Sequence, residues 1–431
     1  MNKSILRLAI PNIISNITVP LLGLVDMYLV GHLDSEDYIG AIALATMIFN
    51  FIYWSFSFLR MGTSGFTAQA YGAENTREQT NILLRSLAVA IGAGILIILL
   101  QYLIALVGFY FLDAGLLVKL YAHQYFSIYV WAAPAVLGLY AFNGWYVGMQ
   151  NAKIPMVVAI GINVVNIVLS FTFVYGFKMK LEGVALASAC AQYTGFLSFV
   201  FIWNWKYGAL KQYIDLKVLK DIKSYIPFFK VNSDIFIRTM ALVSVTTFFM
   251  SASAGLGKDI LAVNALLMQL FVLFSYMMDG FAYAAEALTG KFIGANNRSQ
   301  LKILVKHLFL WGTVIAGLFT LIYVFFLDQI LGLLTDKQNL IELSRQFQFW
   351  VCLIPIAGFS AFLWDGIFVG ATASHQMRNS MLIAVSCFFL VYFIFSDIFV
   401  NNILWIAFIV YLALRGGIQT FMASSILNHS R

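Results

Sequence analysis

The segment from Leu8 to Gly31, LAIPNIISNITVPLLGLVDMYLVG, decides what kind of protein this sequence encodes. It is long enough to cross a lipid bilayer, which takes about 20 apolar residues. It nevertheless contains Asp26 and two prolines, Pro11 and Pro20. A carboxylate at the centre of a spanning helix costs about 2.5–3.5 kcal/mol on insertion scales, so it requires a polar cavity, a partner or a proton. Each proline removes a backbone hydrogen bond and favours a bend.

Two interpretations of this segment compete. A helix that bends and carries a titratable group is what an ion-coupled transporter requires, with Pro11 and Pro20 as hinges and Asp26 as the coupling group. The alternative is a kinked packing helix in which Asp26 is hydrogen-bonded to its neighbours. We take the transporter interpretation as the working hypothesis.

The composition of the whole chain is that of a polytopic membrane protein. Of its 431 residues, 61% are hydrophobic and only 10% are charged, whereas a soluble domain carries about 25% charged residues. We therefore predict an all-α integral membrane protein. Its twelve expected spans lie at residues 8–31, 39–61, 83–107, 122–148, 155–176, 183–204, 227–254, 260–285, 304–327, 346–370, 378–397 and 402–427.

The distribution of Lys and Arg predicts the orientation. If the N-terminus is cytoplasmic, the inner segments hold eighteen of these residues and the outer loops six. Because positive residues favour the cytoplasmic side, both termini are predicted to be cytoplasmic. This topology accounts for the net charge of +7, so we expect lipid as a partner and no nucleic acid.

The two halves of the chain repeat. The string YGAEN (71–75) matches IGANN (293–297), and NGWYVG (143–148) matches DGIFVG (365–370), both at an offset of 222 residues. We predict an N-terminal lobe (1–204), a cytoplasmic linker (205–226) and a C-terminal lobe (227–431), with six helices in each lobe. Since each half has an even number of spans, a pseudo-twofold along the membrane normal should relate the lobes, with a central site between them.

Apolar residues alternate with lysines in the linker, at Leu210, Ile214, Leu216, Leu219 and Ile222. Such a pattern is typical of an amphipathic helix on a membrane surface. A plain linker with a positive-inside bias explains it equally well, and the sequence leaves both interpretations open.

Polar residues recur at helical spacing within two spans of the first half. Asn166 and Ser170 are one turn apart, with Asn163 nearby, and Ser188 and Gln192 are again one turn apart. These side chains either line a cavity beside Asp26 or form hydrogen bonds between helices.

The second half contains more carboxylates. Asp234 and Arg238, four residues apart, are predicted to form a buried ion pair. Asp279 and Glu286 share one face of the next helix, and Asp365 lies near the inner end of another. We expect at least one of the acids in this C-lobe polar site to contact substrate or coupling ion, without being able to choose among them.

Several classes of protein are disfavoured. No phosphate-binding loop of the form GxxxxGK[ST] is present, and the histidines and cysteines have no metal or triad spacing. We expect no enzyme activity, cofactor or metal, and an ion gradient as the energy source. Arginines within the membrane are predicted to be limited to Arg238 and Arg60, which argues against a flippase for lipid-linked pyrophosphates.

Four strings resemble a known family: AVNALLMQ (262–269), DGFAYAAEALTGKFIGA (279–295), DGIFVGAT (365–372) and MRNSM (377–381). The twelve spans in two lobes of six, with Pro11 and Asp26 fifteen residues apart in the first span, resemble the multidrug and toxic compound extrusion (MATE) family. Within that family, the four strings and the Asp234–Arg238 turn of the second half resemble the branch of the DNA-damage-inducible protein F. The likeness covers essentially the whole chain.

The resemblance implies an antiporter of the bacterial inner membrane that expels organic compounds, often cationic and amphipathic, against protons or sodium. A monomer suffices for that task. It implies that Asp26 titrates, that Pro11 permits a bend, and that Asn166 and Ser188 are polar partners. Family members often have an acid one turn after this Asn, where the chain has Ser170. Asp26 then works alone, the C-lobe acids share the task, or the ion differs. Export of a lipid-linked precursor or an anionic metabolite is the alternative function.

Overall fold

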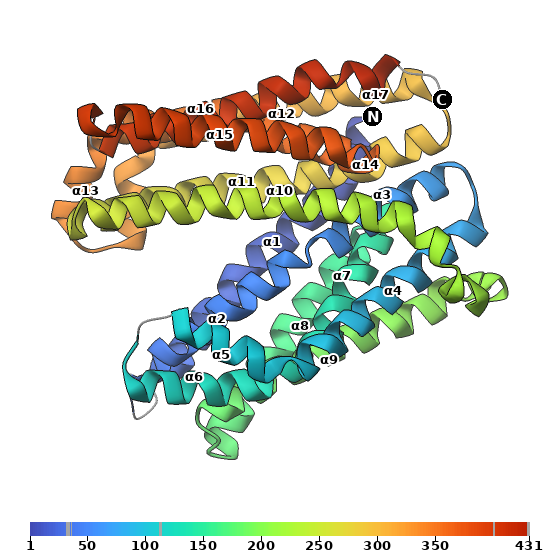
Figure 1. Cartoon of the computed structure of the whole chain (residues 1–431), viewed down its shortest axis with the longest axis horizontal. Helices are drawn as coiled ribbons and strands as arrows, with labels where there is room; N and C mark the ends of the chain where they lie inside the picture. Colours follow the sequence, from blue (N-terminus) through green and yellow to red (C-terminus); the bar gives the residue numbers. More distant parts are fainter. Residues whose placement is uncertain (32–34, 36, 112–113, 400, 429–431) are drawn as a thin grey trace. The chain divides into compact units, whose positions relative to one another are not determined.

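The structure, a computed structural model, describes residues 1–31, 35, 37–111, 114–399 and 401–428, and within these ranges it contains helices and no strand (Figure 1). The prediction of an all-α fold is confirmed. The described residues exclude the side chains at 19–22, 24, 26, 27, 111, 222, 224, 396–399, 425 and 428. Two predicted site residues, Pro20 and Asp26, therefore contribute backbone but no described side chain.

The chain forms two compact units. Pro11–Phe229 makes up one, here called the N-unit, and Met1–Ile10 with Lys230–Arg431 makes up the other, the C-unit. The division falls inside helix α1 (Asn2–Gly31), immediately before Pro11. The first ten residues thus pack with the second half of the chain, where the Trp311 indole donates to Asn2 Oδ1 at 3.4 Å. The predicted N-terminal lobe began at residue 1, whereas the N-unit begins at Pro11.

The N-unit is built from the rest of α1 and eight further helices. These are α2 (Asp37–Ser55), α3 (Phe58–Gly72), α4 (Thr76–Leu99), α5 (Gln101–Phe111), α6 (Leu116–Tyr129), α7 (Ala133–Gly148), α8 (Lys153–Phe171) and α9 (Leu181–Lys206), with the short helices η1 (Val130–Ala132), η2 (Thr172–Gly176), η3 (Gly208–Tyr213) and η4 (Leu216–Lys220).

The C-unit contains longer helices. These are α10 (Ile222–Gly255, entering from the N-unit), α11 (Lys258–Gly294), α12 (Arg298–Leu334), α13 (Gln338–Arg345), α14 (Gln348–Gly370), α15 (Ser374–Phe399), α16 (Asn401–Met422) and α17 (Ser424–Asn428).

Eleven segments of the described chain are long and apolar enough to cross a membrane. They correspond to eleven of the twelve predicted spans, and α1 corresponds to the first. Many run beyond the predicted ends: the span expected at 39–61 is Asp37–Gly72. Polar residues can continue a helix beyond the bilayer, so hydropathy alone does not locate helix ends. The expected span at 83–107 instead crosses a helix break at Leu100, and the last one overruns the end of α16 at Met422.

The predicted repeat extends to the backbone. Glu74 and Asn296, which are 222 residues apart, both have positive φ, 55° and 56°. In each case an asparagine follows and caps the next helix: Asn75 Oδ1 accepts from the amide of residue 78 at 3.0 Å, and Asn297 Oδ1 from that of residue 300 at 3.1 Å. The two halves therefore use the same turn between their second and third spans.

The glycines of the second repeated string serve close helix packing. A Cβ atom on Gly144 would lie 2.3 Å from the carbonyl oxygen of Arg60, and one on Gly366 would lie 2.2 Å from that of Ala282. All four positions obey the offset of 222. In each half only a residue without a side chain lets the fourth span approach the second this closely, α7 on α3 and α14 on α11.

Candidate functional site

The N-unit encloses a cavity of about 430 Å³ between helices α1, α2, α6, α8 and α9. Its described lining is neutral, and the polar part consists of Thr46, Asn50, Tyr53, Asn166, Ser188 and Gln192, together with the phenols of Tyr125 and Tyr129. A volume of 300–1,000 Å³ with an apolar lining and a few polar groups is typical of sites for small organic molecules.

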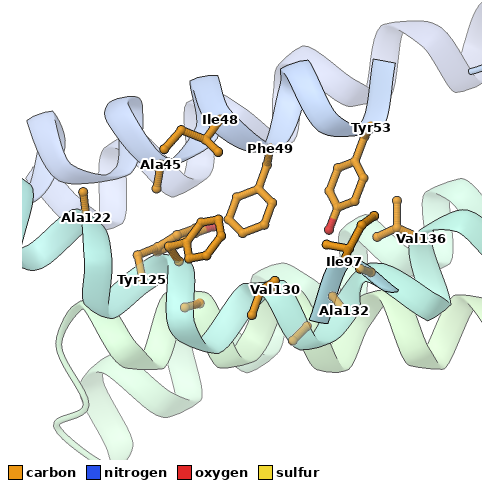
Figure 2. Packing of buried hydrophobic residues seen from close by; sticks show 14 of the residues in the cluster. Ala45, Ile48, Phe49, Tyr53, Ile97, Ala122, Tyr125, Val130, Ala132 and Val136 are labelled. Atoms are coloured by element: carbon orange, nitrogen blue, oxygen red, sulfur yellow. The ribbon is translucent and has the colours of Figure 1, made fainter. Parts of the chain in front are cut away.

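Aromatic side chains from α2 and α6 form one wall of the cavity. Phe49 and Tyr53 are one turn apart on α2, and they face α6, which carries Tyr125 (Figure 2). Tyr129, one turn after Tyr125 on α6, also lines the cavity. Phe49 lies 4.8 Å from the Tyr129 ring, edge to face. Tyr53 is only 7% exposed, and its hydroxyl has no hydrogen-bond partner within the described part of the chain. Since buried hydroxyls are normally satisfied, this one is available to a guest or to water.

Helices α8 and α9 contribute a short chain of hydrogen bonds to the cavity. Asn166 Nδ2 on α8 donates to Ser188 Oγ on α9 at 2.9 Å, and Ser170 Oγ approaches Asn166 Oδ1 at 3.4 Å. Asn166 and Ser188 also line the cavity. The structure thus brings together three residues that the sequence singled out, and the two interpretations, cavity lining and bonding between helices, both apply.

Helix α1 contributes Gly23 and Val30 to the same lining. Residue 26 is three positions after Gly23 and four before Val30, so its backbone lies on the stripe of α1 that faces the cavity. The amide of Asn163 on α8 donates to the carbonyl of Thr18 on α1 at 3.1 Å, which ties the two helices together. At Pro11, whose carbonyl accepts from Ser15 Oγ at 3.0 Å, α1 passes from one unit to the other.

A buried ionic cluster occupies the C-unit. Asp365 on α14, 5% exposed, accepts hydrogen bonds from Arg238 on α10, from Arg415 on α16, and from Gln419 on α16 at 2.6 Å. Arg415 is 1% exposed and also lies over the ring of Phe362, 5.7 Å from its centroid. Three helices are therefore joined through one carboxylate.

The predicted Asp234–Arg238 ion pair is wrong. Asp234 pairs instead with Arg378 at 2.6 Å and accepts from Ser374 Oγ at 2.8 Å, both on α15, whereas Arg238 pairs with Asp365. Spacing of four residues permits a pair on one helix, but each side chain has a better-placed opposite charge on a neighbouring helix.

Sequence reasoning missed Arg378, Arg415, Gln419 and Ser374. It predicted that arginines within the membrane are limited to Arg238 and Arg60. Arg415 is buried inside α16, so that limit is wrong. The signal was available: Arg415 and Gln419 are one turn apart in an otherwise apolar span. The other two predicted acids, Asp279 and Glu286, lie on α11, with Glu286 buried at the contact with α14.

Comparison with known proteins identifies the family. The MatE family model matches residues 11–172 and 235–398, one stretch in each half. The chain belongs to the MATE family. It is 37% identical over 417 residues to the DNA damage-inducible protein F of Escherichia coli K12, which covers 96% of this chain and 90% of that protein. Rabbit multidrug and toxin extrusion protein 1 is 27% identical over 361 residues, covering 80% of this chain and 60% of the relative.

Solved MATE structures have the same fold. A MATE protein crystallised in the bent conformation superposes with a TM-score of 0.86 at 20% identity, covering 99% of this chain and 96% of that one. An outward-facing multidrug resistance MATE transporter gives 0.84 at 20% identity, with 99% and 97% covered. The expectation of a membrane transporter rather than an enzyme is confirmed, and small molecules are the substrates that such a family implies.

Proposed function

We propose that this MATE protein is a secondary active antiporter that exports organic, cationic amphipathic compounds in exchange for protons or sodium ions. The cavity of the N-unit carries the proposal, because it combines an aromatic wall with neutral hydrogen-bonding groups. Aromatic faces attract organic cations by about 0.5–2 kcal/mol each. A neutral lining holds a flat cation without fixing one chemical structure, as an exporter of varied compounds requires.

Asp26 is the proposed coupling group. Its backbone position on α1 between Gly23 and Val30 supports this, since both neighbours line the cavity. In the proposed cycle, a proton or sodium ion neutralises Asp26, α1 bends near Pro11, and the organic cation leaves. Each elementary charge that crosses 100 mV supplies about 2.3 kcal/mol.

The C-unit acids are less suited to this task. Asp365 is the shared counterion of two guanidinium groups, and Asp234 is the counterion of a third. Protonating Asp365 would leave Arg238 and Arg415 as buried charges without a counterion, at a cost of several kcal/mol. We therefore propose that these pairs are structural and that coupling resides in the N-unit.

Efflux from proteoliposomes tests the proposal. A fluorescent organic cation is loaded, and a pH gradient or a sodium gradient is imposed separately on wild type and on Asp26→Asn. We expect efflux under one gradient, lost in Asp26→Asn. Asp37→Asn is the matched control, because it removes another carboxylate of the N-unit. Asp37 lies at the start of α2, where its carboxylate accepts a hydrogen bond from Ser35 Oγ at 3.2 Å. Full gradient-driven efflux by Asp26→Asn would refute the assignment of Asp26.

Export of an organic anion is the second candidate, favoured by the charge of the C-unit cluster. Three arginines (238, 378 and 415) face two aspartates (234 and 365) there, and the Arg378 side chain is 31% exposed. The same vesicles loaded with a fluorescent organic anion distinguish the two candidates. Transport of the anion and not of the cation would establish the second.

A further inference from the structure

The segment that joins the halves is docked on the N-unit. After α9 ends at Lys206, the ring of Tyr207 packs edge-on against Trp145 with centroids 5.0 Å apart, and its hydroxyl accepts from Asn151 Nδ2 at 3.2 Å. Burial raises the pKa of this hydroxyl. Leu210 is 8% exposed, so it faces the bundle. The segment is thus held in place at the end of a membrane span.

A second attachment lies further along. Asp215 accepts from Arg77 of α4 at 3.3 Å, and its other oxygen accepts from the amide of Lys217 at 3.0 Å, which starts η4. The sequence left open whether this segment is an amphipathic helix or a plain linker, and the structure has two short 3₁₀ helices here, η3 and η4. Three residues per turn bring positions three apart onto one ridge.

The exposed face of this segment carries both apolar and basic side chains. On η4, Leu216 and Leu219 form one ridge, 66% and 37% exposed, and Lys217 and Lys220 form the next. Trp205 just before the segment is 81% exposed. In all, five exposed lysines (206, 211, 217, 220 and 223) stand against two acids (215 and 221), one of them already paired with Arg77.

We propose that residues 205–223 form a docking surface for anionic phospholipid headgroups in the adjacent leaflet. Leu216, Leu219 and Trp205 suit the boundary between headgroups and acyl chains, and the lysines suit the lipid phosphates. The segment begins where the membrane-spanning part of α9 ends, which places it at headgroup depth. A free phosphate would use the lysines but not the leucines. This inference does not depend on the substrate or ion of the proposed antiport.

Quenching of Trp205 fluorescence in bilayers tests the surface. The protein is reconstituted with rising fractions of dibrominated phosphatidylglycerol or dibrominated phosphatidylcholine, and the Trp205 signal is the difference between wild type and Trp205→Phe. We expect half-quenching at a several-fold lower fraction of the anionic lipid. Each surface lysine near an anionic bilayer contributes about a fivefold preference, so K217Q/K220Q should reduce the preference by up to about 25-fold.

Two further variants make the result specific. K119Q/K178Q removes the same charge elsewhere, because Lys119 lies at the start of α6 and Lys178 lies just before the start of α9, whereas residues 205–223 follow the end of α9. This variant should leave the lipid preference unchanged. L216S/L219S should weaken quenching by both lipids. Equal quenching of wild-type Trp205 by the two lipids would overturn the proposal. If K217Q/K220Q and K119Q/K178Q changed the lipid preference equally, the proposal would also be overturned. The preference would then follow from the overall charge of the protein and not from residues 205–223.

Discussion

Replacing Asp365 by asparagine should destabilise the C-unit more than almost any other removal of a single charge. The carboxylate is 5% exposed and accepts from two guanidinium groups and from the Gln419 amide at 2.6 Å. Asparagine retains one acceptor oxygen but turns an NH₂ group toward the other donors. Arg415, 1% exposed, then remains as a buried charge without compensation.

The expected loss follows from these contacts. Removing one partner of a buried ion pair costs about 3–5 kcal/mol. Loss of all three hydrogen bonds to the charged carboxylate, at about 1.5–3 kcal/mol each, would cost more than this. The actual loss is smaller, because the oxygen of asparagine still accepts a hydrogen bond. We therefore expect Asp365→Asn to lower the free energy of unfolding by about 3–5 kcal/mol. Denaturant-induced unfolding of the purified protein in detergent measures it. Asp336→Asn, in an exposed loop, should change it by less than about 0.5 kcal/mol.

A triple replacement, R238M/D365L/R415M, separates lost pairing from lost packing. Because apolar residues of similar volume often replace a buried ionic cluster at no cost, this variant should recover most of the stability that Asp365→Asn loses. A loss below about 1 kcal/mol in Asp365→Asn, or a triple variant weaker than the single one, would refute this account of the cluster.

Three further changes probe other parts of the fold. Gly366→Ala places a methyl group 2.2 Å from a carbonyl oxygen of α11. It should lower the thermal midpoint of unfolding, at a cost of about 1–3 kcal/mol. Gly161→Ala is the control: no atom lies within 4 Å of the added methyl group, so the midpoint should stay unchanged or rise. Gln348→Leu removes the amide that donates at 3.1 and 3.0 Å to two carbonyls of α12 beside its non-helical residue 326. Hydrogen exchange should therefore accelerate at the C-terminal end of α12 and nowhere else in that helix. Asn166→Leu removes the bond to Ser188 in the N-unit cavity and should reduce cation efflux at least tenfold while the melting temperature shifts little; a normal efflux rate would remove Asn166 from the site.

The sequence predicted what depends on local pattern. Hydropathy identified the spans, and the offset of 222 predicted paired features that the backbone repeats at Gly144 and Gly366. Spacing along one helix also predicted that Asn166 and Ser170 share a face. The sequence did not predict which side chains pair between different helices: Asp234 pairs with Arg378 on α15, and Arg238 pairs with Asp365 on α14. That choice depends on which neighbour lies opposite, and spacing within one helix carries no information about it.

The repeat itself shows why one half is better suited to coupling than the other. Asn143 and Asp365 occupy equivalent positions, beside glycines in the same close packing. The N-unit therefore has a neutral amide where the C-unit has a carboxylate joined to two arginines. A carboxylate in that setting cannot accept a proton without stranding its partners, so it resists the charge changes that a transport cycle requires. The N-unit has instead a cavity whose described lining is neutral. This difference in chemistry, on a shared backbone, supports the proposal that coupling resides at Asp26 and that Asp365 serves the stability of the C-unit.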